Sequence, residues 1–197
     1  MRGQWRIGVM VGCGAAVALA AWGGDVSAEA RQLAERLVAL VRGAPAWHGV
    51  LLLAVMPAVC EELLFRGWVL SAFAGERPAP RRACVAVVVQ AAAFAAFHLL
   101  PERMPQTFAL GLLAGWMTLA TRSLLPAVVA HAVHNATPVV LVALASADEI
   151  EAVASGGSSA LPTWIVAVGV GCLVAGVVTL ACGWHGRWRE PWTPTDG

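Results

Sequence analysis

Three charged side chains stand close together inside an otherwise apolar segment that runs from Trp47 to Ala74: Glu61, Glu62 and Arg66. A charged residue at membrane depth costs roughly 2.5–3.5 kcal/mol on insertion scales, so it needs a partner or a function. In a helix, Glu62 and Arg66 share a face and are expected to form an ion pair. Glu61 lies about 100° round the helix and keeps a carboxylate available for chemistry. The alternative is a buried ion pair that only fixes helix packing.

The rest of the chain is apolar enough for a membrane protein. Of its 197 residues 59% are hydrophobic and 13% are charged, and the mean hydropathy is +0.72. This composition is typical of a polytopic membrane protein. The formal net charge of +1 excludes a broad basic surface for nucleic acid. We therefore expect the lipid bilayer as its surroundings and no nucleic-acid partner, while the oligomeric state is left open.

Two segments precede the central one. Residues 7–22 are apolar and predict a first membrane helix. The small residues Val26-Ser27-Ala28 resemble a cleavage site, so a removed signal peptide is the alternative. Residues 28–43 place leucines on one face and charged residues on the other, which predicts an amphipathic helix lying in the membrane interface.

Five further apolar runs complete the chain: 46–74, 83–100, 106–120, 124–145 and 161–182. They predict an all-α polytopic bundle of about six membrane helices with one interfacial helix. Gly111 and Gly115 stand four residues apart, so they are expected to let two helices approach closely. We divide the chain into an N-terminal part (1–45), a central core (46–145), and a last part (146–197) with a polar loop, a final helix and a Trp-rich tail.

The arginines predict the orientation in the membrane. In a six-helix arrangement eight of them fall on one side, and four fall on the other side with an acidic loop at 148–151. Positively charged loops stay in the cytoplasm, so we expect a multi-pass cell-membrane protein with both termini cytoplasmic.

Polar residues on three predicted helices can meet at one depth. Glu61 and His98 each lie about 14 residues, roughly 21 Å, from the turn that joins their helices. His131 lies only about seven residues past Leu124, roughly 10 Å. This difference requires a tilted helix or a recessed connection at Arg122.

Carboxylate, imidazole and amide groups are together the parts of a hydrolytic site. His131 and Asn135 are four residues apart and share a face, and His134 lies at its edge. Any one of these histidines, taken alone, could instead be a hydrogen-bonded packing residue.

These residues fall into three motifs. They are Glu61-Glu62-Leu63-Leu64-Phe65-Arg66, Phe94-Ala95-Ala96-Phe97-His98 and His131-Ala132-Val133-His134-Asn135. Over roughly residues 48–145 the chain resembles the CAAX-protease and bacteriocin-processing (CPBP or Abi) family of intramembrane endopeptidases, whose motifs EExxxR, FxxxH and HxxxN occur in this order.

The resemblance implies a role for each motif residue. Glu61 would be the general base that activates water, with His98 assisting. Glu62 and Arg66 would hold the helix and orient the site, and His131 and Asn135 would stabilise the oxyanion. Phe94 would be a packing residue beside the site, and His134 is secondary because it stands outside the motif.

Metal use is left open by the motifs. His98, His131 and a carboxylate could hold zinc. The chain has no HExxH pair and its histidines stand on separate helices, so we expect no metal and no other cofactor.

The resemblance implies an endopeptidase that cleaves membrane-associated or C-terminally tagged peptides. Family substrates are prenylated tails, leader peptides and sorting tags, and we favour a bacterial peptide or sorting tag. The alternative is a non-catalytic membrane immunity or scaffold protein of the same fold. A proton-relay transporter using the glutamates, and a Cys60 nucleophile paired with His98, are weaker alternatives.

Overall fold

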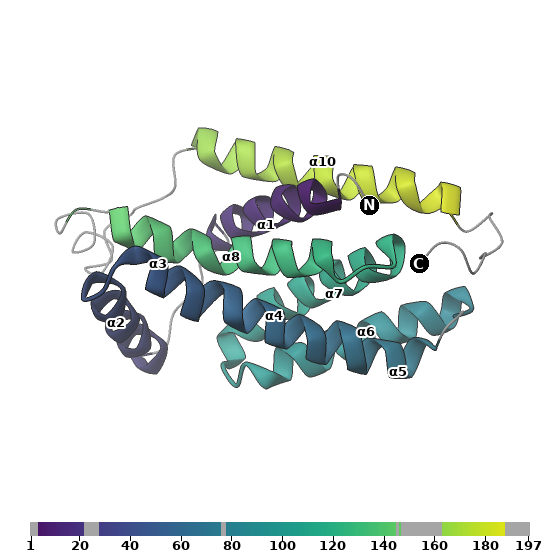
Figure 1. Cartoon of the computed structure of the whole chain (residues 1–197), viewed down its shortest axis with the longest axis horizontal. Coiled ribbons are helices and arrows are strands. Elements are labelled where there is room, and N and C mark those ends of the chain that lie inside the picture. The colour runs from purple at the N-terminus through teal and green to yellow at the C-terminus, as the bar shows by residue number, and fades with distance from the viewer. Residues whose placement is uncertain (1–3, 22–27, 76–77, 145, 147–162, 188–197) are drawn as a thin grey trace.

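The computed structural model describes residues 4–21, 28–75, 78–144, 146 and 163–187, and these residues form helices joined by short connections, without a strand. Figure 1 shows their arrangement. In chain order the helices are α1 (Gln4–Ala21), α2 (Ala28–Arg42), α3 (Ala46–Gly49), η1 (Val50–Val55), α4 (Met56–Glu62), η2 (Leu63–Leu70), α5 (Ser71–Ala74), α6 (Pro80–Phe97), η3 (Pro101–Arg103), α7 (Met104–Thr121), α8 (Leu125–Leu144) and α10 (Thr163–Arg187).

The predicted all-α membrane helix bundle is confirmed. Within the described residues, three helices are long and apolar enough to cross a membrane: Ala46–Ala74, Pro80–Phe97 and Leu125–Leu144. Helices α1, α7 and α10 pack with them, and the prediction that these three also cross the membrane stays a prediction. Val26 and Ser27 of the expected cleavage motif, the polar loop at 148–159 and the tail from residue 188 lie outside the described residues.

The segment from Ala46 to Ala74 is one continuous helix that changes its hydrogen-bonding pattern along its length. The segments η1 and η2 have the wider turns of a π-helix, and the intervening α4 carries Pro57 and both central glutamates. Proline has no backbone N–H to donate, so a helix that contains one must adjust its hydrogen bonds locally. Such π-helical turns are frequent at functional sites.

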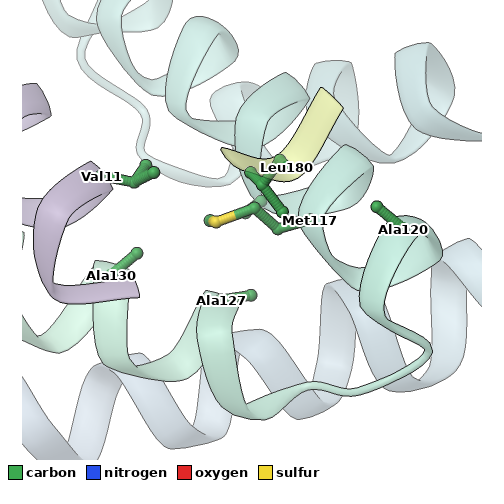
Figure 2. Packing of buried hydrophobic residues seen from close by; sticks show 7 residues of the cluster. Val11, Met117, Ala120, Ala127, Ala130 and Leu180 are labelled. Carbon is green, nitrogen blue, oxygen red and sulfur yellow. The ribbon is translucent and has the colours of Figure 1, made fainter. Parts of the chain in front are cut away.

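Glycines let α1 approach α8 and α10 closely. A Cβ atom added at Gly8 would lie 2.5 Å from the Pro126 carbonyl oxygen, and one at Gly12 would collide with the backbone of Ala130. On the opposite side, a Cβ at Gly14 would lie 2.5 Å from the Leu173 amide nitrogen of α10. Only residues without a side chain permit these distances, and they bring the buried side chains in Figure 2 together: Val11, Ala114, Met117, Ala120, Ala127, Ala130 and Leu180.

Helices α6 and α7 form a close pair through the two glycines that the sequence singled out. A Cβ at Gly111 would lie 2.9 Å from the Cα of Ala91, and one at Gly115 would lie 2.5 Å from Gln90 Nε2. The buried Gln90 amide donates hydrogen bonds to the carbonyl oxygens of Gly111 (2.7 Å) and Val87 (3.0 Å). The predicted close helix approach is therefore confirmed.

Helix α2 lies at one end of the bundle and runs across the direction of the long helices (Figure 1). Its residue Val41 is buried, whereas Leu33, Leu37 and Leu40 stay exposed together with the charged Glu35 and Arg36. An uncovered apolar face beside a charged one is what a helix in the membrane interface requires.

Candidate active site

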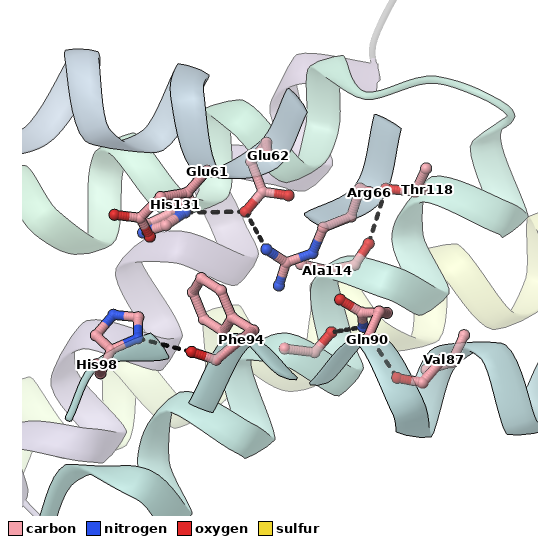
Figure 3. A network of polar contacts seen from close by, with 11 residues as sticks. Glu61, Glu62, Arg66, Val87, Gln90, Phe94, His98, Ala114, Thr118 and His131 are labelled. Atoms are coloured by element: carbon pink, nitrogen blue, oxygen red, sulfur yellow. Dashed lines mark hydrogen bonds and ion pairs between the residues drawn. The ribbon is translucent and has the colours of Figure 1, made fainter. Parts of the chain in front are cut away.

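Glu62 is the centre of a buried polar cluster that joins α4, η2 and α8 (Figure 3). Its Oε1 atom lies 2.8 Å from Arg66 Nη1 and 2.9 Å from His131 Nδ1. An ionised carboxylate only accepts hydrogen bonds, so both nitrogen atoms donate. The ion pair predicted between Glu62 and Arg66 is present, and His131 adds a contact that the helical spacing did not predict.

Glu61 points to a different side of α4 and meets the other nitrogen of the same imidazole. Its Oε2 atom lies 3.7 Å from His131 Nε2, and its side chain is 20% exposed. His131 is therefore placed between the two glutamates, with Nδ1 bound to Glu62 and Nε2 turned toward Glu61. The sequence predicted no same-face partner for Glu61, and the structure supplies one from another helix.

The depth of His131 is explained by a recessed connection between α7 and α8. A Cβ atom at Gly67 would lie 3.6 Å from Leu124 Cδ1, so this connection lies beside Gly67 and not beside the α5–α6 turn at Gly75. Eight residues separate these glycines along the helix, about 12 Å. Leu124 and Gly67 lie at one level. His131 follows Leu124 by seven residues, about 10 Å, and Glu62 precedes Gly67 by five residues, about 8 Å, so the two side chains lie at similar depth.

Phe94 forms an apolar wall that contacts several polar members of the cluster. Its ring centroid lies 4.3 Å from Arg66 Cζ, 4.8 Å from the His98 ring and 5.6 Å from the His131 ring. A guanidinium over an aromatic face is attracted by the ring quadrupole. This contact stabilises the Arg66 guanidinium, whose Nε and Nη2 atoms are buried without a hydrogen-bond partner in the described part of the chain. Phe94 thus packs beside the site and also helps to hold the Arg66 guanidinium in place.

His98 caps the end of α6 and does not lie within that helix. The sequence placed it inside a span of 83–100, but α6 ends at Phe97 because Leu99 adopts a left-handed conformation with φ 57°. His98 Nδ1 lies 2.9 Å from the Phe94 carbonyl oxygen, which can only accept, so the Nδ1–H donates. The other ring nitrogen, Nε2, makes no hydrogen bond among the described residues. In Figure 3 the His98 ring lies on the same side of Phe94 as Glu61, and the structure records no direct hydrogen bond between them.

Three other candidates stand outside the hydrogen-bonded cluster. Asn135 lies on α8 one turn beyond His131, is half-buried, and makes no hydrogen bond to the cluster among the described residues. The Nδ1 atom of His134 is buried without a partner in that same part of the chain. Cys60 is exposed and is not hydrogen-bonded to His98 in the described residues.

Gln90 is a site-supporting residue to which the sequence analysis gave no role. It is fully buried, it links α6 to α7, and it stands one helical turn before Phe94 on the same face. A single amide in an otherwise apolar helix, four residues from a motif residue, is the signal that could have identified it.

The described side chains offer no preformed metal site. No group of three His, Cys, Asp or Glu residues in the described part of the chain is arranged to hold a metal ion. His98, His131 and a carboxylate do not form such a group within the described residues, and the use of a metal stays a prediction to be tested.

Residues 43–137 match the family model described as type II CAAX prenyl endopeptidase Rce1-like. Through this segment the chain is similar to the Rce1-like type II CAAX prenyl endopeptidases. The matched segment contains all three motifs, so the resemblance that they indicated is confirmed. At the level of the family, an Rce1-like chain is an intramembrane endopeptidase that works on peptides in a lipid bilayer. No curated protein and no solved structure matches the chain in the other two comparisons.

Proposed function

We propose that this chain hydrolyses a peptide bond of a membrane-associated or C-terminally tagged substrate, with Glu61 as the base that activates water. The observation that carries the proposal is the difference between the two adjacent glutamates. Glu62 is fully buried and its Oε1 atom is shared by Arg66 and His131. The Glu61 side chain is partly exposed, and its Oε2 atom is buried without a hydrogen-bond partner among the described residues, so this carboxylate is available to bind a water molecule.

In the first step, the Glu61 carboxylate takes a proton from water while the water oxygen bonds to the scissile carbonyl carbon. The electron pair of the C=O π bond moves to the carbonyl oxygen and forms an oxyanion. His98 accepts a hydrogen bond from the same water at Nε2, because its Nδ1–H is held by the Phe94 carbonyl oxygen. This geometry would orient the attacking water between a carboxylate and an imidazole.

The oxyanion would be stabilised by two donors from α8. In its protonated form, His131 donates Nδ1–H to Glu62 and presents Nε2–H beside Glu61, where the substrate carbonyl is expected. Asn135, one turn further along α8, would add a side-chain N–H. Donors held in place before the reaction stabilise the developing charge without reorganisation, which makes such groups effective catalysts.

In the second step, Glu61 returns its proton to the leaving amine. The C–N bond breaks, the carbonyl forms again, and the new carboxylic acid loses its proton to solvent. Glu62 and Arg66 take no part in these transfers and act by holding His131 in place. Each step uses only side chains of this chain, and a zinc-dependent reaction is the alternative that chelation tests.

The orientation and the substrate belong to the same proposal. Gln4 Nε2 donates to the Thr121 carbonyl oxygen (3.4 Å), so the start of α1 and the α7–α8 turn lie at one end of the bundle. Figure 1 places the α5–α6 connection and the end of α10 at this same end. The arginine-rich connections therefore lie at one end of the bundle. Because positively charged loops stay in the cytoplasm, this arrangement supports a multi-pass cell-membrane protein with both termini cytoplasmic. The substrate would be a bacterial leader peptide or a C-terminal sorting tag.

The test is cleavage of lipid-anchored peptides by the purified full chain in vesicles. Wild type is compared with Glu61→Gln, which keeps the shape of the side chain but removes the base. We expect cleavage to be lost while thermal stability is retained. Cleavage by Glu61→Gln at the wild-type rate would overturn the mechanism. No cleavage by the folded wild type across all substrate classes would instead favour a non-catalytic scaffold or immunity protein.

A further inference from the structure

A cavity of about 410 Å³ lies where the end of α2, the start of α3 and the end of α8 meet. The described residues that line it are Val41, Arg42, Ala44, Ala46 and Ala143. In Figure 1 these three segments lie together at one end of the bundle, whereas α4 with its two glutamates lies nearer the middle. The cavity is therefore separate from the candidate active site.

The packing of the three helices explains why a cavity forms there. A Cβ atom at Gly49 would lie 3.0 Å from Val139 Cγ1 on α8 and 3.5 Å from Val41 Cγ2 on α2, so the helices meet closely at this level. About one helical turn away, the residues that line the cavity from α3 and α8 are the small Ala46 and Ala143. Close contact at one level and small side chains at the next leave space for another molecule.

Three observations place the cavity at the level of the lipid head groups. Helix α2 has the uncovered apolar face of an interfacial helix, and its Leu40 is 56% exposed. Trp47, the neighbour of Ala46, is 60% exposed, and tryptophan is enriched at membrane–water interfaces. Ala143 stands one residue before the end of α8, which is long and apolar enough to cross the membrane. Such a helix ends where hydrocarbon gives way to head groups.

The cavity combines a positive charge with apolar surroundings. Arg42, the last residue of α2, is the charged one among the described residues that line it. A guanidinium presents a planar fork of N–H donors that matches two oxygen atoms of a phosphate group. Leu40 on α2 and Leu144 on α8, next in sequence to lining residues or one removed from them, are both largely exposed. This combination fits a molecule that carries a phosphate at one end and hydrocarbon at the other.

We propose that this cavity binds the head group of an anionic phospholipid, with the phosphate on Arg42 and the acyl chains against Leu40 and Leu144. Basic pockets between membrane helices bind anionic head groups, whereas a choline group would bring a second cation close to Arg42. A lipid held there joins α2 to α3 and α8, so it stabilises this end of the bundle. The inference goes beyond the proposed function and does not depend on it, because the cavity takes no part in peptide cleavage.

The experiment measures thermal unfolding of the purified full chain in micelles of an uncharged detergent. Phosphatidylglycerol, phosphatidylcholine or inorganic phosphate is added in turn. A ligand that binds only the folded chain stabilises it by mass action, so we expect saturating phosphatidylglycerol to raise the unfolding midpoint by about 5 °C or more. Phosphatidylcholine should raise it less than half as much, and inorganic phosphate should leave it unchanged. An equal effect of the two lipids, or the full effect from phosphate alone, would overturn the proposal.

Two variants test the residues of the cavity. Arg42→Gln removes the charge, and Ala143→Leu fills the space while it keeps Arg42, so both should lose most of the shift that phosphatidylglycerol produces. Arg36→Gln is the matched control for the charge, because Arg36 is exposed on α2 and is not among the residues that line the cavity. Ala72→Leu is the control for the added volume, because Ala72 is exposed on α5.

Each shift is measured from the variant's own midpoint without lipid, so a less stable variant is not mistaken for one that fails to bind. Native mass spectrometry should find one tightly held phosphatidylglycerol on wild type and on both controls. If Arg42→Gln and Ala143→Leu keep the wild-type shift, the cavity is not the binding site. If Arg36→Gln loses the shift as fully as Arg42→Gln, the lipid responds to the general charge of α2, and the proposal is overturned.

Discussion

The Nδ1 atom of His131 lies 2.9 Å from Oε1 of Glu62, and this contact joins α8 to α4 inside the bundle. The same oxygen also accepts from Arg66, at 2.8 Å. One buried carboxylate therefore sets the positions of a cation and of the imidazole that faces Glu61. In a chain that crosses a membrane, these charges have no water to replace a lost partner, so the cluster governs both stability and geometry.

Removing one member of the buried ion pair should destabilise the chain strongly. Arg66→Ala leaves the Glu62 carboxylate without its cation, and breaking a buried pair in this way costs about 3–5 kcal/mol. The measurement is the free energy of unfolding in mixed micelles. Arg81→Ala is the control, because Arg81 is exposed at the start of α6 and should cost under about 1 kcal/mol. Equal stability of the two variants would mean that the pair does not hold the bundle together.

Substitution of Asn135 should separate catalysis from stability. Because its side chain makes no hydrogen bond to the cluster among the described residues, Asn135→Ala should change the free energy of unfolding by less than about 1 kcal/mol. If the amide donates to the oxyanion, kcat should fall about 10²- to 10³-fold while KM stays near its wild-type value. A KM effect without a kcat effect would assign Asn135 to substrate binding.

Phe94 should be far more important for stability than Phe97, its near neighbour in the sequence. Phe94 is fully buried against Arg66 and two imidazole rings. Phe94→Ala should therefore cost about 3–5 kcal/mol. Phe97→Ala removes a largely exposed ring and should cost much less. Thermal unfolding of both variants, alongside wild type, measures the difference, and a similar loss in both would show that Phe94 is not the wall of the site.

The close contact between α1 and α8 should control activity from outside the matched segment. A side chain at Gly12 would collide with the backbone of Ala130, the residue before His131. Gly12→Leu should therefore shift α8, costing roughly 1–3 kcal/mol of stability and lowering kcat. Gly171→Leu is the matched control, since nothing lies within 4 Å of a Cβ atom there. Full activity of Gly12→Leu would show that α8 can hold His131 in place without this contact.

Chelation tests the metal alternative directly. Because the described residues hold no group of three metal-ligating side chains in position, we expect cleavage to continue after dialysis against EDTA. The rate before and after dialysis is the measurement. Loss of activity that added zinc restores would require the histidines to converge on a metal when substrate binds.

Most helix positions could be predicted from the sequence because each is a local property. The amphipathic segment 28–43 and the apolar runs 106–120 and 124–145 correspond to α2, α7 and α8 within a few residues. The pair of Glu62 and Arg66 could also be predicted, because a spacing of four places two residues on one helix face. The end of α6 was predicted less well, since the left-handed turn at Leu99 breaks an apolar pattern that continues through Leu100.

The sequence by itself determined the class of the chain, the order of its helices and the residues able to do chemistry in a membrane. Only the tertiary structure decided which of those residues meet. The recessed turn beside Gly67 raises His131 to the level of Glu62, and the Phe94 ring contacts both His131 and His98. Helical spacing relates residues on one helix, whereas the relative depth of two helices depends on loop position and on glycine contacts between them. That is why His131 appeared too shallow in the sequence and yet lies between both glutamates in the fold.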